Sequence, residues 1–515
     1  MTKRTTKLVT ALSLAVIVFA GINSFAATGV LFNAAGSSGA FNAFALAADR
    51  KGSECGTNIW TKKNGASGID NRSASIPANT ANIWIVWNTS KTSVCAYLAV
   101  DSVIGQQLFF AVPRGTLSIP STEIGVAGDN LVATLTDVPL PAAIYTLINN
   151  AVFNAAPSDI RPEDALFEAQ RVLAPLDTVH YNGLGYGPGP VGTTILSSQS
   201  TKSVTPVAYA ISGTDPISGM AVPAFHTTNV GAQAVIFFVN TTDTSAGGFG
   251  TATFSNVSRF VLADFLNGNL TRTRDMAAQT GLPSIGAHVF VREPTSGTYT
   301  TTEFTIPRSV EIGSTQELNV NPAINNPLNI AYASGGTRQR VVGTGEMVAT
   351  VGAVTDSLGY AFWSTTNFSK VLSTTKYLTV DGVDPLFPTY LESNGVFPNC
   401  TAPCPGLVPF TNIANGSYPA WNILRIVTAQ PAPTTVTNLI SQAEAGAANV
   451  TPDFLPLTAL QVFRSHYGQV GRGPSNGLIT GKPENGGDVG GAVFTNQADL
   501  DFFADTGKEL TGQRQ

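Results

Sequence analysis

The chain has 515 residues, which is more than one hydrophobic core normally supports, so two or more lobes are expected. Only 12% of the residues are charged and the net charge is −5, which excludes binding to nucleic acid through an overall positive field. The chain contains 50 Gly and 31 Pro and is therefore rich in turns. An acidic protein that binds an anion must use local dipoles and one or two Arg side chains.

The N-terminal 26 residues have the composition of a secretory signal peptide. Three basic residues precede the apolar run Leu8 to Ile22, and Ser24-Phe25-Ala26 has small residues at the two positions that signal peptidase inspects. No other stretch approaches about 20 apolar residues, so the mature chain is expected to be soluble. No Cys directly follows the cleavage site, which argues against a lipid anchor and predicts a periplasmic or secreted protein.

All four cysteines lie in the exported part of the chain: Cys55, Cys95, Cys400 and Cys404. Oxidation is permitted there, and the even number favours disulfides. Cys400 and Cys404 could close a small loop, which would leave Cys55 to pair with Cys95. A zinc site is the alternative, but the spacing does not match and the four His residues are scattered. No metal and no cofactor is therefore expected.

The first predicted strand and helix are joined by a turn of small residues. Val30 to Phe32 reads as a strand, Ala40 to Ala48 reads as a helix, and Ala35-Gly36-Ser37-Ser38-Gly39 lies between them. Hydroxyls and glycines are thereby placed at an exposed helix start, where backbone N–H groups carry a partial positive charge. This arrangement suits an oxyanion.

A second turn of the same kind follows the apolar run Ile285 to Val291. Ser296 and Thr298 are good helix-capping residues, and Gly297 lets the backbone come close to a bound group. Arg292, at the end of the strand, offers a planar fork of donors. Two such turns facing each other would close an anion site. An ordinary capped helix preceded by a surface Arg is the alternative.

Asp159, in Pro157-Ser158-Asp159, is a lone carboxylate that either opposes anion binding or accepts a proton from the ligand. A third small polar turn is Gly65-Ala66-Ser67-Gly68. The Gly- and Pro-rich stretch from Gly183 to Gly192 is predicted to be a loop, and no Gly-Lys-Ser/Thr follows it, which excludes a nucleotide-binding loop.

The remaining elements alternate between strand-like and helical runs. Further strands are expected at Asn58–Trp60, Asn82–Trp87, Cys95–Val100, Gln107–Val112, Val207–Ile211, Gly231–Asn240, Tyr360–Trp363, Lys376–Thr379 and Ala420–Val427. Further helices are expected at Ala142–Phe153, Glu163–Leu173, Val261–Leu266 and Val436–Ala443. The predicted organisation is lobe 1 at 27–205 with a β-rich insertion at about 70–141, lobe 2 at 206–364, a return to lobe 1 at 365–480 and a surface tail at 481–515.

Taken in order, the turn at 35–39, the turn at 65–68, Asp159 and the segment 292–298 resemble the periplasmic phosphate-binding protein of the bacterial phosphate ABC transporter. Supporting similarities are the short helix from Val261 with its Gly turn, Gly343-Thr344-Gly345 before Ser357 to Tyr360, and Tyr418-Pro419 before an apolar strand. The resemblance covers roughly residues 30 to 445. It implies the α/β, two-lobed type II periplasmic-binding-protein fold, with mixed sheets flanked by helices and one ligand between the lobes.

The resemblance also implies roles for individual residues. Asp159 would accept a proton from the ligand, so that protonated phosphate binds and sulfate is rejected, and Arg292 would pair with the charge. The remaining ligand-binding residues that it implies are Ser37, Ser38, Gly39, Ser67, Ser296, Gly297 and Thr298. The chain departs from the family in having Ala66 where a Ser is usual, so that Ser67 is the substitute, and in its long β-rich stretch and C-terminal tail.

The resemblance predicts a monomeric, exported protein that captures inorganic phosphate or a similar oxyanion, with the membrane permease of an ABC transporter as its partner. An enzyme is not expected, because the sequence contains no Gly-x-Ser-x-Gly elbow, no clustered His and no metal-ligand spacing. Two alternatives remain: a surface or structural protein that keeps the fold without transport, and a phosphoester hydrolase that uses Asp159 or Ser38.

Overall fold

The computed structural model describes residues 29–63, 81–111, 113–162, 165, 193–195, 225–277, 281–292, 296–306, 330–341, 343–399, 407–429, 433–466, 472–473, 478–479 and 490–494. Several predictions fall outside these residues. They are the signal peptide, the turn with Ser67, the loop at 183–192, the strand at 207–211, most of the helix at 163–173, Cys400 with Cys404, and most of the tail.

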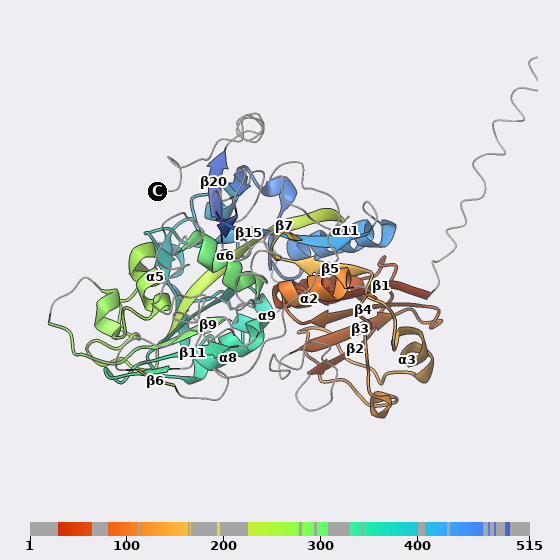
Figure 1. Ribbon diagram of the computed structural model, residues 1–515, viewed down its shortest axis with the longest axis horizontal. Helices are drawn as coiled ribbons and strands as arrows, with labels where there is room; N and C mark the ends of the chain where they lie inside the picture. The colour runs from red at the N-terminus through yellow and green to blue at the C-terminus, as the bar shows by residue number, and fades with distance from the viewer. Residues whose placement is uncertain are drawn as a thin grey trace, which may run out of the picture.

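Most of the described strands form one large mixed sheet with two parts. In spatial order, the first part contains β2 (Asn58–Lys63), β3 (Asn82–Trp87), β4 (Ser93–Ala99), β1 (Gly29–Gly36), β5 (Ala155–Ser158), β15 (Trp421–Thr428) and β7 (His226–Asn240). The order continues through β12 (Ser357–Phe362), β9 (His288–Arg292), β11 (Thr337–Val341), β10 (Ile330–Tyr332) and β6 (Thr193–Ile195). Figure 1 shows β7 and β15 between the two parts.

The strand β7 belongs to both parts of the sheet. Its residues 226–234 pair antiparallel with β15, and its residues 235–239 pair antiparallel with β12. The edge strands β13 (Thr375–Tyr377) and β16 (Leu455–Pro456) also pair with β7. Three two-stranded sheets complete the described strands: β14 (Thr379–Val380) with β8 (Asn256–Val257), β17 (Phe463–His466) with β20 (Gly490–Phe494), and β18 (Arg472–Gly473) with β19 (Leu478–Ile479).

Helices cover both faces of the first part, which explains why its strands are apolar on both sides. The side chains of Ile83 and Ile85 on β3 share one core with residues of α2 (Ser102–Phe110) and α3 (Ala142–Ile148). Trp84 and Val86, which alternate with them, share the opposite core with α1 (Phe41–Ala48) and α11 (Thr434–Asn449). Each core is thus fixed by strand alternation.

The second part has its own core around the C-terminal half of β7. Residues of α5 (Arg259–Asn267) and α8 (Thr344–Ala353) pack there against β7, β9 and β12. Residues between 365 and 413 also contribute to this core, and the chain next pairs with β5 at β15. The remaining described helices are α6 (Gly297–Thr305), α9 (Thr365–Phe368), α10 (Thr411–Ala414) and the short 3-10 turns η1 (Ser38–Ala40), η2 (Ser121–Glu123), η4 (Thr273–Met276), η5 (Tyr390–Glu392) and η6 (Leu457–Ala459).

The mixed α/β architecture predicted from the sequence is confirmed, but one element is of the wrong type. The strand predicted at Gln107–Val112 is wrong, because Ser102–Phe110 is the helix α2. Val103, Ile104 and Leu108 lie on one face of this helix and enter the core beside β3. A short apolar run such as Leu108 to Ala111 has no periodicity that separates a strand from a buried helix.

The disulfide predicted between Cys55 and Cys95 is confirmed. It joins the segment before β2 to the middle of β4, so it links residues 40 positions apart in the sequence. Within the described part of the chain, no helix combines the length and the apolar character that crossing a membrane requires.

Candidate functional site

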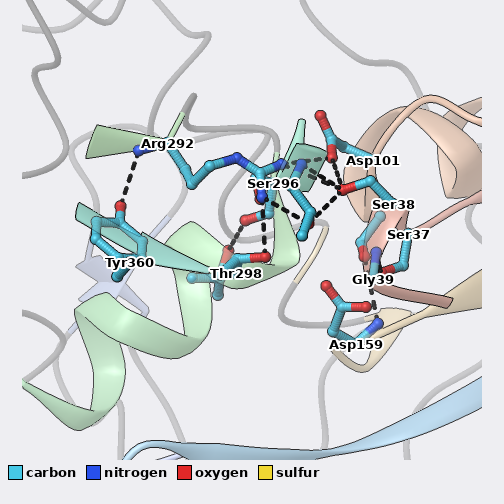
Figure 2. A network of polar contacts seen from close by, with 12 residues as sticks. Ser37, Ser38, Gly39, Asp101, Asp159, Arg292, Ser296, Thr298 and Tyr360 are labelled. Atoms are coloured by element: carbon cyan, nitrogen blue, oxygen red, sulfur yellow. Dashed lines mark hydrogen bonds and ion pairs between the residues drawn. The ribbon is translucent and has the colours of Figure 1, made fainter. Parts of the chain in front are cut away.

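The candidate site lies where strand ends from both parts of the sheet meet. In the first part β1 is parallel to β4 and to β5, so the chain leaves all three strands at the same edge of the sheet. The segments that follow them are 37–39, 101–102 and 159. In the second part β9 is parallel to β11, and their carboxyl ends lead to the starts of α6 and α8. Figure 2 shows the side chains that gather there.

The helix α2 comes very close to the strand that carries the first turn. A β-carbon on Gly105 would lie 2.3 Å from the carbonyl oxygen of Ala35 and 2.4 Å from the Cα of Gly36. Only a residue without a side chain fits there. This contact fixes the start of α2, with Asp101 and Ser102, beside the turn that follows β1.

Arg292 is fully buried, and both sides of its guanidinium group are hydrogen-bonded. Its Nη2 lies 2.7 Å from Asp101 Oδ1 and 3.5 Å from Ser38 Oγ. Its Nη1 donates to Thr298 Oγ1 at 3.2 Å and to Thr344 Oγ1 at 3.3 Å. The guanidinium group therefore reaches from the second part of the sheet to the turn after β1 in the first part.

The Ser38 hydroxyl group joins the two parts of the sheet from the other side. Its Oγ lies 3.2 Å from Asp101 Oδ1 and 3.0 Å from Thr344 Oγ1, and it accepts from the backbone N–H of Thr344 at 3.3 Å. The neighbouring Ser37 Oγ accepts from the backbone N–H of Gly39 at 3.1 Å, which holds the turn closed. Ser38 and Thr344 are 306 residues apart in the sequence.

Asp159 is 1% exposed and lies below the Ser37 to Gly39 turn. Its backbone N–H donates to Ser102 Oγ at 3.3 Å, while its Oδ1 has no hydrogen-bond partner among the described residues. Burial raises the pKa of this carboxyl to about 7. The negative charge of Asp101 raises it further, while Ser37, Arg292 and Ser102 act in the opposite direction. A carboxyl group with a pKa near neutrality can accept or donate a proton.

The start of α6 packs directly on Asp159. A β-carbon on Gly297 would lie 2.5 Å from Asp159 Oδ2 and 2.6 Å from Ser102 Oγ. Ser296 is the N-cap of α6, but its side chain makes no capping hydrogen bond, and its buried Oγ has no partner among the described residues. Asn422 on β15 holds this arrangement, because its amide donates to the carbonyl of Asp159 and to Thr301 Oγ1 on α6.

The structure brings nearly all of the predicted ligand-binding residues into this one cluster: Ser37, Ser38, Gly39, Asp159, Arg292, Ser296, Gly297 and Thr298. Ser67 lies outside the described residues. Three cluster members were not predicted, namely Asp101, Ser102 and Thr344. Ser102 and Thr344 follow the same pattern of strand, small polar turn and helix, but Ser102 was hidden by the strand predicted at Gln107–Val112.

The cluster can hold a small polar anion. The starts of α2, α6 and α8 converge on it, and N–H groups at a helix start carry a partial positive charge. Arg292 adds a full positive charge, and the hydroxyl groups can donate or accept hydrogen bonds. Among the described residues, no three His, Cys, Asp or Glu side chains gather closely enough to hold a metal ion.

No family model matches the chain, and no curated protein is similar to it in sequence. Similar solved structures include a phosphate-binding protein from Stenotrophomonas maltophilia, with 14% identity, 84% of this chain and 92% of that chain covered, and a TM-score of 0.37. An ABC-type phosphate transport receptor from Vibrio cholerae is 16% identical, with 44% of this chain and 68% of that chain covered and a TM-score of 0.26. A substrate-binding protein of a phosphate ABC transporter from Clostridium perfringens, solved with bound phosphate, is 15% identical, with 44% of this chain and 71% of that chain covered and a TM-score of 0.28. All three TM-scores are below 0.5.

Proposed function

We propose that the chain is an exported solute-binding protein that captures inorganic phosphate, or a related oxyanion, where the two parts of the sheet meet. The observation that carries the proposal is the buried convergence of Arg292 with the hydroxyl groups of Ser38, Thr298 and Thr344. A tetrahedral oxyanion offers acceptors in several directions. A planar guanidinium group and rotating hydroxyl groups can satisfy them together.

The helix starts support the same ligand class. Ser296, Gly297 and Thr298 open α6, and Ser102 opens α2 beside Asp159. The Oγ of Ser296 is buried and has no partner among the described residues, so a ligand oxygen would satisfy it. Backbone N–H groups at these helix starts would donate to the same ligand.

Asp159 gives the proposed site its selectivity. Its Oδ1 is a buried acceptor without a partner among the described residues. When Asp159 is ionised, a phosphate that carries a proton can donate to this oxygen, whereas sulfate, which has no proton near neutral pH, would place two acceptors in contact. The site should therefore prefer phosphate and arsenate to sulfate.

The proposed context is uptake. The predicted signal peptide exports the chain, and the type II periplasmic-binding-protein resemblance implies that it works as a monomer and delivers its ligand to the membrane permease of an ABC transporter. No cofactor is needed for capture or release, because the ligand is held by hydrogen bonds and charge alone.

Isothermal titration calorimetry of the mature chain with phosphate, arsenate and sulfate tests the proposal. Phosphate and arsenate should bind at micromolar concentrations, and sulfate should bind far more weakly. If phosphate does not bind at these concentrations, the proposal is wrong and a surface or structural protein is the better description. Steady hydrolysis of a chromogenic phosphate ester would instead indicate an enzyme.

The variant Asp159→Asn separates selectivity from raw affinity. Its amide N–H can donate to sulfate, so the preference for phosphate should shrink, chiefly because sulfate binds more tightly. Asp453→Asn is the matched control, because Asp453 is also a buried carboxyl group but accepts from the backbone N–H of Thr365 at the start of α9. Unchanged selectivity in Asp159→Asn would contradict the role given to Asp159.

A further inference from the structure

The cluster contains a second carboxyl group, that of Asp101, which the proposed function does not use. Its Oδ1 lies 2.7 Å from Arg292 Nη2 and 3.2 Å from Ser38 Oγ. Its side chain is 4% exposed. Figure 2 shows the carboxyl group of Asp101 above Ser38, facing the end of the Arg292 side chain. One oxygen of Asp101 thus already sits between two of the donors proposed to bind the oxyanion.

This carboxylate does not serve the helix that it precedes. Asp101 is the N-cap of α2, a position where an Asp side chain usually accepts from a backbone N–H of the first turn. Here the side chain makes no capping hydrogen bond. It points instead to Arg292, which belongs to the second part of the sheet. The contact is therefore not explained by stabilisation of α2.

The backbone of Asp101 also has an unusual conformation for a residue other than glycine. Its φ is 77°, in the left-handed region that favours glycine and that other residues adopt uncommonly. A glycine would fit this position with less strain but would leave Arg292 Nη2 without its carboxylate partner. The conformation places the Asp101 carboxylate on the guanidinium group.

We propose that Asp101 is an internal competing anion, whose carboxylate holds the place of a ligand oxygen on Arg292 and Ser38 until an oxyanion displaces it. This inference rests on the proposed function, because the ligand that displaces Asp101 is the same phosphate. Binding exchanges one set of hydrogen bonds for another, and no covalent bond changes. Asp101 thereby sets the phosphate concentration at which the site fills.

The Asp101 carboxylate must leave Arg292 when phosphate binds, because the two negative charges repel each other. Asp101 and Asp159 already place two carboxyl groups near a single Arg292, and the charge of Asp101 disfavours ionisation of Asp159. An additional anion beside both carboxylates would meet repulsion that a buried, weakly screening environment strengthens. The apparent dissociation constant rises as the fraction of molecules in which the Asp101 carboxylate has left Arg292 falls. Asp101 should therefore weaken phosphate binding.

A purely positioning role for Asp101 predicts the opposite result. If the carboxylate only aimed the guanidinium group at the ligand, its removal would leave Arg292 less well oriented, and phosphate would bind more weakly. The two roles differ in the sign of the change in affinity, so one titration separates them.

The experiment compares the mature wild-type chain with Asp101→Gly and Asp101→Asn, using inorganic phosphate in calorimetry at one pH and ionic strength. Asp101→Gly should bind phosphate about tenfold more tightly or better, since Gly suits a φ of 77° and removes the carboxylate that competes with phosphate for Arg292. Asp101→Asn should show a smaller gain, because its neutral amide still offers an acceptor to Arg292 but competes less well. Thermal unfolding without phosphate checks that both variants are folded.

Asp381→Asn is the matched control. Asp381 pairs with Arg259 at 2.6 Å on the surface, so this change removes the same charge from another Arg–Asp pair. It should leave phosphate affinity unchanged. Unchanged or weaker binding by folded Asp101→Gly would overturn the inference, while the proposed function would stand if the wild-type chain binds phosphate. If neither the wild-type chain nor the Asp101 variants bind phosphate, both are wrong.

Discussion

Gly297 and Asp159 occupy one space: a β-carbon on Gly297 would lie 2.5 Å from the Oδ2 of Asp159. The start of α6 can approach the buried carboxyl group only because residue 297 has no side chain. We predict that Gly297→Ala will push α6 away from Asp159 and Ser102. The affinity for phosphate should fall at least about tenfold, and the free energy of unfolding should fall by about 1 to 3 kcal/mol. Calorimetry and urea unfolding measure the two effects.

Gly345→Ala is the control for this change. Gly345 lies in the first turn of α8, and a β-carbon there would have Asn367 Oδ1 at 3.5 Å as its nearest neighbour. An Ala at this helical position should leave the stability unchanged or raise it by up to about 1 kcal/mol. Equal losses of phosphate affinity in both Gly variants would contradict the close contact assigned to Gly297.

We further predict that Ser102 contributes to phosphate binding through its hydroxyl group. Its Oγ accepts from the backbone N–H of Asp159 and lies where a β-carbon on Gly297 would clash. Removal of a hydroxyl group beside an anion typically costs about 1.5 to 3 kcal/mol, so Ser102→Ala should weaken binding about tenfold or more. Ser258→Ala is the control, because Ser258 caps α5 through the N–H of Val261. It should cost about 1 kcal/mol of stability and no affinity.

The raised pKa of Asp159 predicts a pH dependence of stability. Burial raises this pKa to about 7, whereas an unfolded Asp titrates near pH 4. Between these values the native protein retains a proton that the unfolded chain has lost. The contribution is complete below about pH 4 and is lost as the pH rises through about 7, with a fall in the free energy of unfolding of up to about 4 kcal/mol.

Urea unfolding at a series of pH values, without phosphate, measures this fall. Asp159→Asn should show a smaller fall over the same range, because its amide does not titrate. Burial also raises the pKa values of Asp49, Asp356 and Asp453 to about 6, so part of the fall will remain in the variant. If the free energy of unfolding falls equally with pH in the wild-type chain and in Asp159→Asn, Asp159 does not retain a proton in the native protein.

The sequence revealed those site residues that stand in short local patterns. Ser38, at a turn between strand and helix, and Arg292 at a strand end each have a local signal. Asp101 had none, because an Asp before a helix normally predicts a cap, and only the tertiary structure directs its carboxylate to Arg292. Thr344 joins the cluster through Ser38, 306 residues away. Contacts of this kind depend on strand order, which local periodicity does not encode.

The Cys55–Cys95 disulfide should stabilise the first part of the sheet. It closes a loop of 40 residues, for which loop-closure entropy predicts about 4 kcal/mol. The double variant Cys55→Ser with Cys95→Ser should therefore unfold at a lower urea concentration than the oxidised wild-type chain. A reductant should produce a similar decrease in the wild-type chain and little further change in the variant. A double variant as stable as the oxidised protein would contradict this contribution.

The long strand β7 has a consequence for how the chain can be divided. Because residues 226–234 pair with one part of the sheet and residues 235–239 pair with the other, the two parts share β7 where they meet. A fragment cut on either side of β7 would expose a row of unpaired backbone groups, which is a template for aggregation. Gene fragments that encode the two parts separately should therefore yield insoluble protein, and an evolutionary exchange of one part alone would have to preserve the pairing of β7 with both β15 and β12.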